Sequence, residues 1–414
     1  MNCRADIAII GGGAAGLAAA ITAKKNAPFA EVCIYEALDR VGKKLITTGN
    51  GRCNITNSDI AQNRYHGDDV SFAFSVFEKN PNSEISAFFE EVGIPLTYEE
   101  NKAYPASFQA SSVVDCLRFK CDELGVKTVC GCKITDVEFG KNQFILTADE
   151  QKLYAKSVIC CTGLYSGGEK LGSNGVFFRL LKEKGFKTVR LSPAIVQLKT
   201  ETELVKQLKG IKVNAEVSLY CENKKLETVF GEVLFCDYGL SGPAVMHLSR
   251  EAARNDASYS ISLDLLPSCD KNTLKNELLK RKELLINRKI EDFFTGMLNK
   301  RLGQVILKYC GLPLSKGVSS IDKAAIDNIA SAVKDFRFKV TGNTGFINSQ
   351  VTAGGISTSE FSDRNLMSKR YRGLFACGEL LDIDGDCGGF NLAWAWISGI
   401  RAGKSAAEYV GVKK

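Results

Sequence analysis

Three glycines near the N-terminus, Gly11, Gly13 and Gly16, have the GxGxxG spacing, and the acid Glu36 follows twenty residues after the last of them. In this spacing the first glycine permits a tight turn, the second lets a pyrophosphate approach the backbone, and the third lets a helix pack closely on a strand. The unpaired N–H groups at a helix N-terminus attract phosphate. A carboxylate such as Glu36 can accept hydrogen bonds from a ribose hydroxyl. These residues predict a dinucleotide site, and they do not by themselves distinguish FAD from NAD.

Basic residues follow Glu36 in the segment ALDRVGKKLITTGNGRCNITN, which also contains several glycine and asparagine residues. We expect Arg40 and Lys43 to contact the cofactor, and Lys44 and Arg52 belong to the same segment. A basic loop beyond the second strand can neutralise a pyrophosphate that leads to a second, larger ring, and this favours FAD. The alternative interpretation is a cationic loop exposed to solvent.

A second group of glycine and acidic residues lies near the C-terminus. The apolar run GLFAC is followed by Gly378 and Glu379, where a carboxylate is suited to accept hydrogen bonds from ribityl hydroxyls. Gly388 and Gly389 then precede a helix that starts near Asn391. We expect the N-terminus of this helix to face the flavin, because its partial positive charge would stabilise the anionic reduced ring. The alternative is an ordinary closing helix packed on the sheet.

The elements that must position these residues follow from the apolar pattern. ADIAII and EVCIYE indicate buried parallel strands, and AAGLAAAITAKK between them indicates a helix. Residues 111–125 have helical spacing, and short strands between 126 and 163 indicate an antiparallel meander whose last strand returns to the sheet. We expect the backbone of Ile134, at the start of the meander, to contact the adenine. Gly163, at its end, is another point of close approach.

The character of the chain changes after Lys187. Residues 193–265 alternate strand patterns with turn signals, which predicts a small β domain. Residues 270–335 are helical in pattern and strongly charged, and FRFKVTG then indicates a returning strand. We therefore expect a β module with a helical insert to interrupt the dinucleotide domain. The basic helix at 275–289 is interpreted as a solvated face with ion pairs, and nucleic-acid binding is the alternative.

Composition also limits the kinds of ligand and site that the chain is expected to have. The chain has 414 residues, 54 Lys and Arg against 47 Asp and Glu, and a net charge of +7 that is scattered along the sequence. We interpret this charge as weak attraction for anionic ligands. Fifteen cysteines without a CxxC pair predict free thiols in a reducing cytoplasm, and only two histidines argue against a metal site. No apolar stretch is long enough to predict a membrane span.

Proton delivery to a substrate needs one polar group near the cofactor. Cys53 in GRCN and Tyr238 in DYGLSG are the candidates for catalysis, and Tyr104 is a further one. Cys53, beside Arg52, would act as a nucleophile only with a lowered pKa. For each residue the alternative is a structural role, as a small buried side chain or as an aromatic residue at a barrel edge.

The segments GGGAAGLAAA, GKKLITTGNGRCNITN, DYGLSGPA, VTAGGIST and GELLDIDGDCGGFNLAWAWISGIRAG together resemble a family of bacterial and archaeal flavoproteins. This is the NAD(P)/FAD-dependent oxidoreductase family, also called aminoacetone-oxidase-like, which includes a 3-dehydro-bile acid Δ4,6-reductase. The resemblance runs nearly end to end and implies an α/β fold: a glutathione-reductase-type FAD-binding Rossmann domain interrupted by a β-barrel domain carrying a helical insert. The sequence departs from the family at Cys160 and Cys161, because related flavoproteins usually have Ala-Thr-Gly before this loop.

From the pattern and the resemblance we expect an FAD-binding domain at 1–191 and 342–414, a barrel domain at 192–267 and 335–341, and a helical insert at 268–334. The expected cofactor contacts are Gly11, Gly13, Ala15, Gly16, Glu36, Arg40, Lys43, Ile134, Gly163, Gly378, Glu379, Gly389, Asn391 and Leu392.

The expected function is that of an FAD-dependent oxidoreductase, with NAD(P)H as a transient electron donor and a small enone as the hydride acceptor. An oxidase of a small amine or amino ketone is one alternative, and a flavin-containing RNA-modifying or RNA-binding protein is another. As partners we expect a small-molecule substrate, with no nucleic acid and no membrane, for a cytoplasmic monomer or homodimer.

Overall fold

The computed structural model describes residues 4–140, 143–148, 151–254 and 257–411. By its contacts the chain forms two compact units: 1–193 together with 346–414, and 194–345. Within the expected FAD-binding domain, residues 1–3, 141–142, 149–150 and 412–414 lie outside the described residues.

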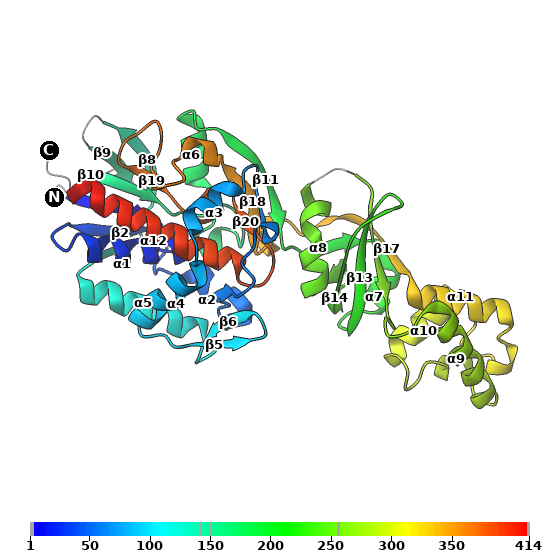
Figure 1. Cartoon of the computed structure of the whole chain (residues 1–414). Coiled ribbons are helices and arrows are strands. Elements are labelled where there is room, and N and C mark those ends of the chain that lie inside the picture. The colour runs from blue at the N-terminus through cyan, green and yellow to red at the C-terminus, as the bar shows by residue number, and fades with distance from the viewer. Residues whose placement is uncertain (1–3, 141–142, 149–150, 255–256, 412–414) are drawn as a thin grey trace. The chain divides into compact units, whose positions relative to one another are not determined.

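A seven-stranded sheet forms the centre of the first unit (Figure 1). Strand β1 (Arg4–Ile10) pairs in parallel with its neighbours on both sides, and β2 is buried along its whole length, as expected for a strand covered on both faces. The strand order is β7 (Lys127–Cys130), β2 (Val32–Glu36), β1, β10 (Gln151–Cys160), β9 (Phe144–Ala148) and β8 (Ile134–Phe139), and β19 (Leu374–Ala376) pairs with the second half of β10.

The predicted meander is confirmed. Strands β8, β9 and β10 pair antiparallel in succession, and β10 then continues between β1 and β19 as a parallel strand. Because parallel strands end at the same edge of a sheet, this topology brings the loops after β1, β10 and β19 to one edge. The predicted N-terminal and C-terminal glycine segments follow two of these three strands.

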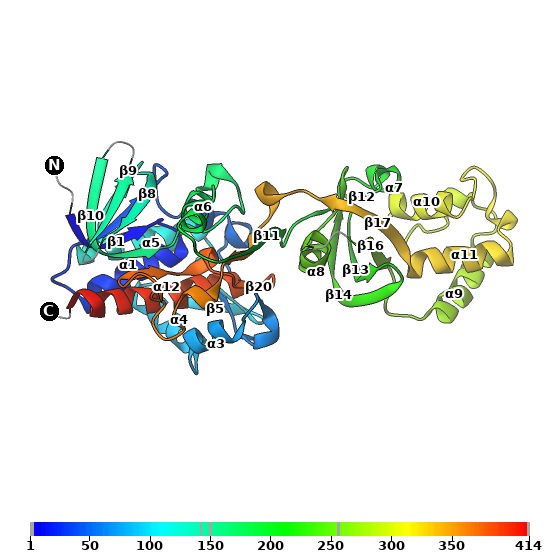
Figure 2. The ribbon, with the colours of Figure 1, turned by 90° about the horizontal axis from the view of Figure 1, so that it is seen from above.

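The first and last helices of the first unit pack directly on one another. Helix α1 (Ala14–Asn26) and helix α12 (Phe390–Gly411) lie side by side in both views, one blue and one red (Figures 1 and 2). A Cβ atom on Gly399 would lie 2.4 Å from the carbonyl oxygen of Ala15, and one on Gly403 would lie 2.3 Å from that of Ala19. The two backbones can therefore approach this closely only because both residues are glycine.

The other helices and strands of the first unit are shorter or cover the sheet. They are α2 (Lys43–Ile46), β3 (Thr56–Asn57), β4 (Tyr65–His66), α3 (Ser71–Phe77), α4 (Pro81–Glu91), β5 (Leu96–Glu99), β6 (Lys102–Pro105), α5 (Ala110–Leu124), α6 (Val176–Glu183), β11 (Thr188–Ala194), β18 (Val351–Ile356) and β20 (Asp384–Gly385).

The second unit contains a closed six-stranded antiparallel barrel. Its strands in order are β12 (Leu198–Thr200), β15 (Gly239–Ser241), β14 (Lys224–Phe235), β13 (Lys212–Cys221), β16 (Tyr259–Asp264) and β17 (Phe336–Asn343). Helices α7 (Thr202–Gln207) and α8 (Pro243–Arg254) are short connections in the barrel. The mixed α/β class with a Rossmann-type sheet and a barrel is thus as predicted.

The predicted helical insert lies between β16 and β17. It contains α9 (Lys271–Leu284), α10 (Lys300–Tyr309) and α11 (Lys323–Lys334), which gather at one end of the second unit (Figure 2). Its apolar residues belong to the same buried cluster as those of the barrel: Leu274 and Ile326 share this core with Val217 and Phe336. The barrel and the insert therefore form one compact body, although the sequence pattern separates them.

Among the described residues, no helix combines the length and the apolar character that crossing a membrane would need.

Candidate cofactor site

The N-terminal glycines form a tight turn in front of α1. Gly11 has a φ of +99°, and a Cβ atom on it would lie 2.7 Å from the carbonyl oxygen of Cys161 at the end of β10. A Cβ atom on Gly16 would lie 1.9 Å from the carbonyl oxygen of Gly11. Around Gly13, in contrast, a Cβ atom would meet nothing within 4 Å. The first and third glycines of the motif are thus required by packing, and the second faces open space.

Glu36 is buried at the end of β2 and binds the same turn. One carboxylate oxygen accepts a hydrogen bond from the N–H of Gly12 at 2.8 Å, and the other accepts one from the N–H of Leu38 at 2.9 Å. Gly12 was not among the expected residues, because it occupies a variable position of the motif. These two bonds fix the carboxylate beside α1, and each oxygen keeps a lone pair with which it could accept from a ribose hydroxyl.

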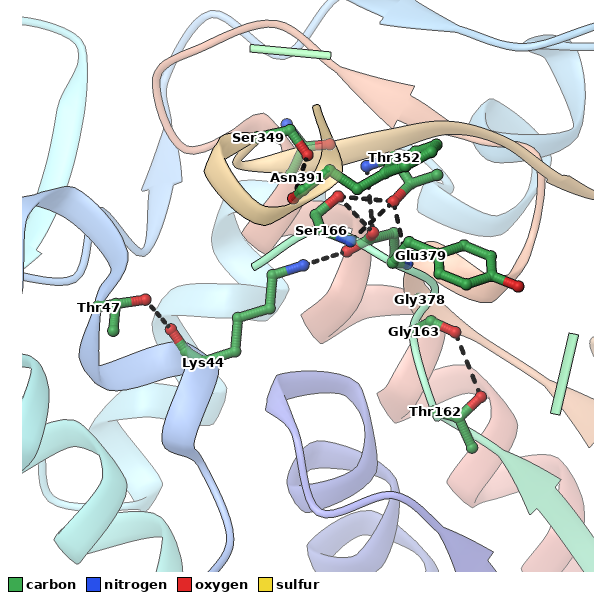
Figure 3. Close-up of polar contacts among 12 residues, drawn as sticks. Lys44, Thr47, Thr162, Gly163, Ser166, Ser349, Thr352, Gly378, Glu379 and Asn391 are labelled. Carbon is green, nitrogen blue, oxygen red and sulfur yellow. Dashed lines mark hydrogen bonds and ion pairs between the residues drawn. The ribbon is translucent and has the colours of Figure 1, made fainter. Parts of the chain in front are cut away.

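Glu379 is the centre of a polar cluster on the loop after β19 (Figure 3). Its carboxylate forms an ion pair with Lys44 at 2.6 Å. On its other oxygen it accepts hydrogen bonds from the Ser166 hydroxyl at 3.2 Å and from the Thr352 N–H at 3.1 Å. The hydroxyl oxygens of Ser166 and Thr352 lie 2.6 Å apart. Three separate segments thus converge on one carboxylate, which has 17% of its side chain exposed.

The basic residues that follow Glu36 have different surroundings in the structure. Lys43 pairs with Asp39 at 2.5 Å, and the side chain of Asp39 is 75% exposed. Lys43 also holds the pKa of that carboxyl below its usual value by hydrogen bonding. Arg40 is exposed. Lys44 belongs to the same segment but was not among the expected cofactor contacts. It is the lysine that reaches Glu379. Its helical position in α2, one residue beyond Lys43, turns it in another direction.

The ends of β10 and β19 meet beneath the glycine turn. Gly163 has a φ of +62° and open space around it, and Gly378 has a φ of +68°. A Cβ atom on Gly378 would lie 3.0 Å from that of Ala15 in the first turn of α1. Gly378 is held from behind by α12, because its N–H donates to Ser398 and its carbonyl accepts from the Trp394 indole. The N-terminal and C-terminal predicted residues are therefore neighbours.

The start of α12 lies against the segment that contains Cys53. Gly389 has a φ of +103°, and a Cβ atom on it would lie 2.7 Å from the carbonyl oxygen of Thr56. The Asn57 amide donates to the carbonyl of Gly388 at 2.8 Å. The amide of Asn391 is used within the protein, since it both accepts from and donates to the backbone of Gly385. Leu392 follows in the first turn and is half-buried.

Two side chains that contact Asp386 in front of α12 were not expected. His66 Nε2 lies 2.8 Å from one carboxylate oxygen of Asp386, and Arg64 lies 3.4 Å from the other. They are brought together because β4 pairs with β20. Neither residue carries a motif, so sequence spacing gave no signal for this contact. Ile134, the expected adenine contact, is buried at the first position of β8.

The two catalytic candidates belong to different units. Cys53 is fully buried with a φ of +59°, and burial raises the pKa of its thiol to about 12, so that it stays protonated at neutral pH. Tyr238 is half-buried between β14 and β15. Burial, and then a hydrogen bond with Cys236, raise the pKa of its phenol. Both groups are therefore potential proton donors, and neither is an ionised nucleophile at neutral pH.

The residues of the first unit fit FAD. Helix α1 has no side-chain cap, and the space beside Gly13 is open, so its first N–H groups are available to a pyrophosphate. Glu36 and Glu379 supply acceptors at two points along the same edge of the sheet, next to β1 and β10 respectively. The two glycine turns at Gly378 and Gly389 leave no side chain in the way. FAD matches this set of donors and acceptors, because it has a pyrophosphate between the hydroxyls of a ribose and those of a ribityl chain.

Comparison with known proteins agrees with this geometry. The family model described as "HI0933-like protein Rossmann domain" matches residues 5–405. A 3-dehydro-bile acid delta(4,6)-reductase from Clostridium scindens is 32% identical over 405 residues, which cover 97% of this chain and 99% of that protein. A ribosomal RNA dihydrouridine synthase from Haemophilus influenzae is 25% identical over 396 residues, or 94% and 95% of the two chains.

Among solved structures, a quinol-fumarate reductase is similar with a TM-score of 0.53 and 16% identity. The similarity covers 100% of this chain and 72% of the other. At this identity the similarity establishes a shared fold only.

Proposed function

The chain belongs to the HI0933-like Rossmann-domain family of FAD-binding oxidoreductases, and from this premise we propose that it reduces a carbon–carbon double bond conjugated to a carbonyl group, with NADH or NADPH as the electron donor. One observation carries the proposal: 32% identity over nearly the full length to a reductase named for such double bonds in a 3-oxo steroid acid. The expected substrate is therefore a small enone, and a planar apolar one is the first to test.

The chemistry is divided between the cofactor and the protein. Once bound and reduced by NADH or NADPH, FAD would supply the hydride that the β-carbon of an enone accepts, while the α-carbon takes a proton. The chain's own part is to hold the dinucleotide through the turn at Gly13, through Glu36 and through the cluster at Glu379. A proton must also reach the substrate, and Tyr238 and Cys53 are our candidates because both stay protonated at neutral pH.

The proposal is tested by anaerobic stopped-flow with the FAD-loaded protein. After reduction by NADH or NADPH, a 3-oxo-4-ene steroid should reoxidise the flavin, and the enone absorbance should disappear. A 3-oxo-5-ene steroid, whose double bond is not conjugated, is the matched control and should not react. Two results would overturn the proposal: equal reoxidation of the flavin by both steroids, or no reoxidation by any enone that is tested. Rapid reoxidation by air during oxidation of an amine would favour the alternative oxidase.

The proton donor is tested separately by Tyr238→Phe, which removes only the hydroxyl. We expect kcat to fall about 100- to 10,000-fold, the usual size of a general-acid contribution, with the flavin affinity unchanged. Because the pKa of Tyr238 is raised, the phenol keeps its proton in alkali, and wild-type kcat should not decline between pH 7 and 9. Steady-state kinetics over this range check both statements, and an unchanged kcat in the variant would remove Tyr238 from the candidates.

A second candidate function comes from the relative named ribosomal RNA dihydrouridine synthase. The uracil ring also contains a carbon–carbon double bond conjugated to a carbonyl, so the same chemistry would give dihydrouridine. Incubation with RNA and NADPH, followed by digestion and mass spectrometry of the nucleosides, tests it. A uridine gaining two hydrogens would support this candidate, and unchanged uridine with active enone reduction would favour the small substrate.

Cytoplasmic location and the oligomeric state remain expectations from the sequence.

A further inference from the structure

Most of the net positive charge of the chain lies in the second unit. Residues 194–345 contain 23 Lys and Arg against 18 Asp and Glu, a net charge of +5 out of +7. The charge is densest in α9 and the loop that follows. Residues 271–289 contain seven Lys and Arg and only two acidic residues, Glu277 and Glu283. The whole-chain balance therefore hides a local excess of positive charge.

Some of these cations serve the fold. Lys275 forms an ion pair with Asp327 of α11 at 2.6 Å, and Arg281 donates to the backbone carbonyls of Phe293 and Thr295. The others have no carboxylate within ion-pair distance among the described residues. We call five such cations the basic tip: Lys280, Lys282, Arg288 and Lys289 from this stretch, and Lys316 from the loop after α10. All are exposed except Lys282, which is half-buried.

The fold brings three members of the basic tip, Arg288, Lys289 and Lys316, onto neighbouring segments. Ile290 donates its N–H to the carbonyl of Lys316, and Val318 donates to the carbonyl of Arg288, each at 2.9 Å. An isolated β-bridge joins Lys289 to Gly317 between these two bonds. Lys316 is thus placed across from Arg288 and Lys289 although it is 27 residues from the latter in sequence. The backbone pairing therefore places three exposed cationic side chains on neighbouring segments, where one polyanion could contact all of them.

Two large apolar side chains stand exposed within the same region. Leu284 is 80% exposed at the last position of α9, and Ile286 is 42% exposed two residues later. Unpaired cations around exposed apolar groups suit a polyanion that also has apolar faces. RNA has this chemistry, with phosphates along its backbone and bases and riboses between them.

We propose that the basic tip binds the phosphate backbone of RNA. This inference rests on the second candidate function, and it opposes the expectation from sequence of no nucleic-acid partner. The relative named for ribosomal RNA matches 94% of this chain, so the match extends across the second unit. A basic and apolar surface could instead lie on an anionic membrane, and we favour RNA because one relative is named for an RNA substrate and none is named for a membrane.

The test uses the full chain loaded with FAD and a fluorescein-labelled RNA hairpin with a uridine-containing loop, measured by fluorescence anisotropy over a salt series. Five phosphate contacts predict a slope of log K against log salt of about −3.5 to −4.5. The tip variant is Lys280→Gln, Lys282→Gln, Arg288→Gln and Lys289→Gln together. We expect it to bind at least about tenfold more weakly, with a slope smaller by about 3.

The matched control carries the same loss of charge on the barrel, at Lys206, Lys224, Lys225 and Lys339, each changed to Gln. These lysines are also exposed and without an ion pair among the described residues. Their removal should change RNA affinity less than threefold. Flavin content and thermal unfolding, measured for both variants, report whether each is folded.

Three results would overturn the proposal: salt-insensitive or absent RNA binding by the wild type, equal weakening in both variants, or tip-dependent binding to phosphatidylglycerol vesicles without binding to RNA. Activity is scored apart from binding. Tip-dependent RNA binding without dihydrouridine formation would support the contact and reject the second candidate function. Enone reduction should be the same in the tip variant and the wild type, because no tip residue belongs to the cofactor site.

Discussion

At the residue scale, two adjacent lysines take different roles. Lys43 pairs with the exposed Asp39 near the start of α2, whereas Lys44 reaches across to Glu379 on the loop after β19. An exposed pair contributes little to stability because water and salt screen it. The Lys44–Glu379 pair is better shielded and is joined to Ser166 and Thr352, so it orders the loop through which the first unit would hold its cofactor.

The first prediction compares these two lysines. Lys44→Met should weaken FAD binding about tenfold, because the loop around Glu379 would lose its cationic anchor and because a hydrogen bond to a charged group is worth about 1.5–3 kcal/mol. Lys43→Met is the control, with an expected change of less than twofold. Quenching of flavin fluorescence on titration into the apoprotein measures both. Equal losses in the two variants would show that only the general charge of the loop matters.

The second prediction concerns Cys53. Burial raises its pKa to about 12, so at pH 8 only about one thiol in ten thousand is ionised. Since the thiolate is the reactive form, iodoacetamide should leave Cys53 unmodified in the folded protein at this pH. Cys130 is exposed and serves as an internal comparison. Peptide mass spectrometry after a short pulse of reagent distinguishes them, and modification of Cys53 ahead of Cys130 would contradict the assignment of a protonated, buried thiol.

At the element scale, the turn in front of α1 separates glycines that the fold needs from one that a ligand needs. Gly16 has the carbonyl of Gly11 where a side chain would lie, and Gly13 has open space. The close approach of α12 to α1 follows the same logic, since Gly399 and Gly403 replace side chains with backbone contact. Helices α1 and α12 can therefore pack this closely because these positions carry no side chain.

The third prediction uses this difference. Gly16→Ala should lower the free energy of unfolding by about 1–3 kcal/mol or more, because the added methyl group overlaps a backbone carbonyl. Gly13→Ala has an ordinary φ of −79° and no clash, so its stability should be unchanged within about 0.5 kcal/mol. It should nevertheless weaken FAD binding at least tenfold, since the methyl group enters the open space. Urea denaturation of the apoproteins and flavin titration measure the two effects, and a stable Gly16→Ala protein would refute the packing argument.

The elements with a strong local signal were predictable. The strand, turn and helix around Gly11 follow from apolar patterning and glycine spacing, and the meander follows from short strands and turns. The choice of Lys44 over Lys43 was not, because it depends on where the loop after β19 comes to lie. The pairing of His66 with Asp386 likewise needs β4 to meet β20, 318 residues later. Local rules do not report contacts between segments so distant in sequence.

At the scale of the whole molecule, the cofactor site and the barrel have separate cores. The buried apolar residues of the first unit form one cluster, and those of the barrel and insert form another. The expected cofactor contacts, from Gly11 to Leu392, all lie in the first unit. The chain thus interrupts a flavin-binding body with an insertion that has its own core and most of the positive charge. This division places every expected cofactor contact in one of the two units.

The fourth prediction removes the second unit. A chain in which a short Gly-Ser linker replaces 194–345 should fold and bind FAD within about threefold of the full-length affinity, because its apolar core and its cofactor residues are retained. Turnover of an enone should fall at least as far as in Tyr238→Phe, because the same phenol is removed. Circular dichroism and flavin titration measure folding and binding, and the same truncation with Gly13→Ala is the control that should lose the flavin. A truncated protein that is folded but colourless would mean that the second unit contributes to the cofactor site, and residues of the barrel would then have to be added to the set proposed here.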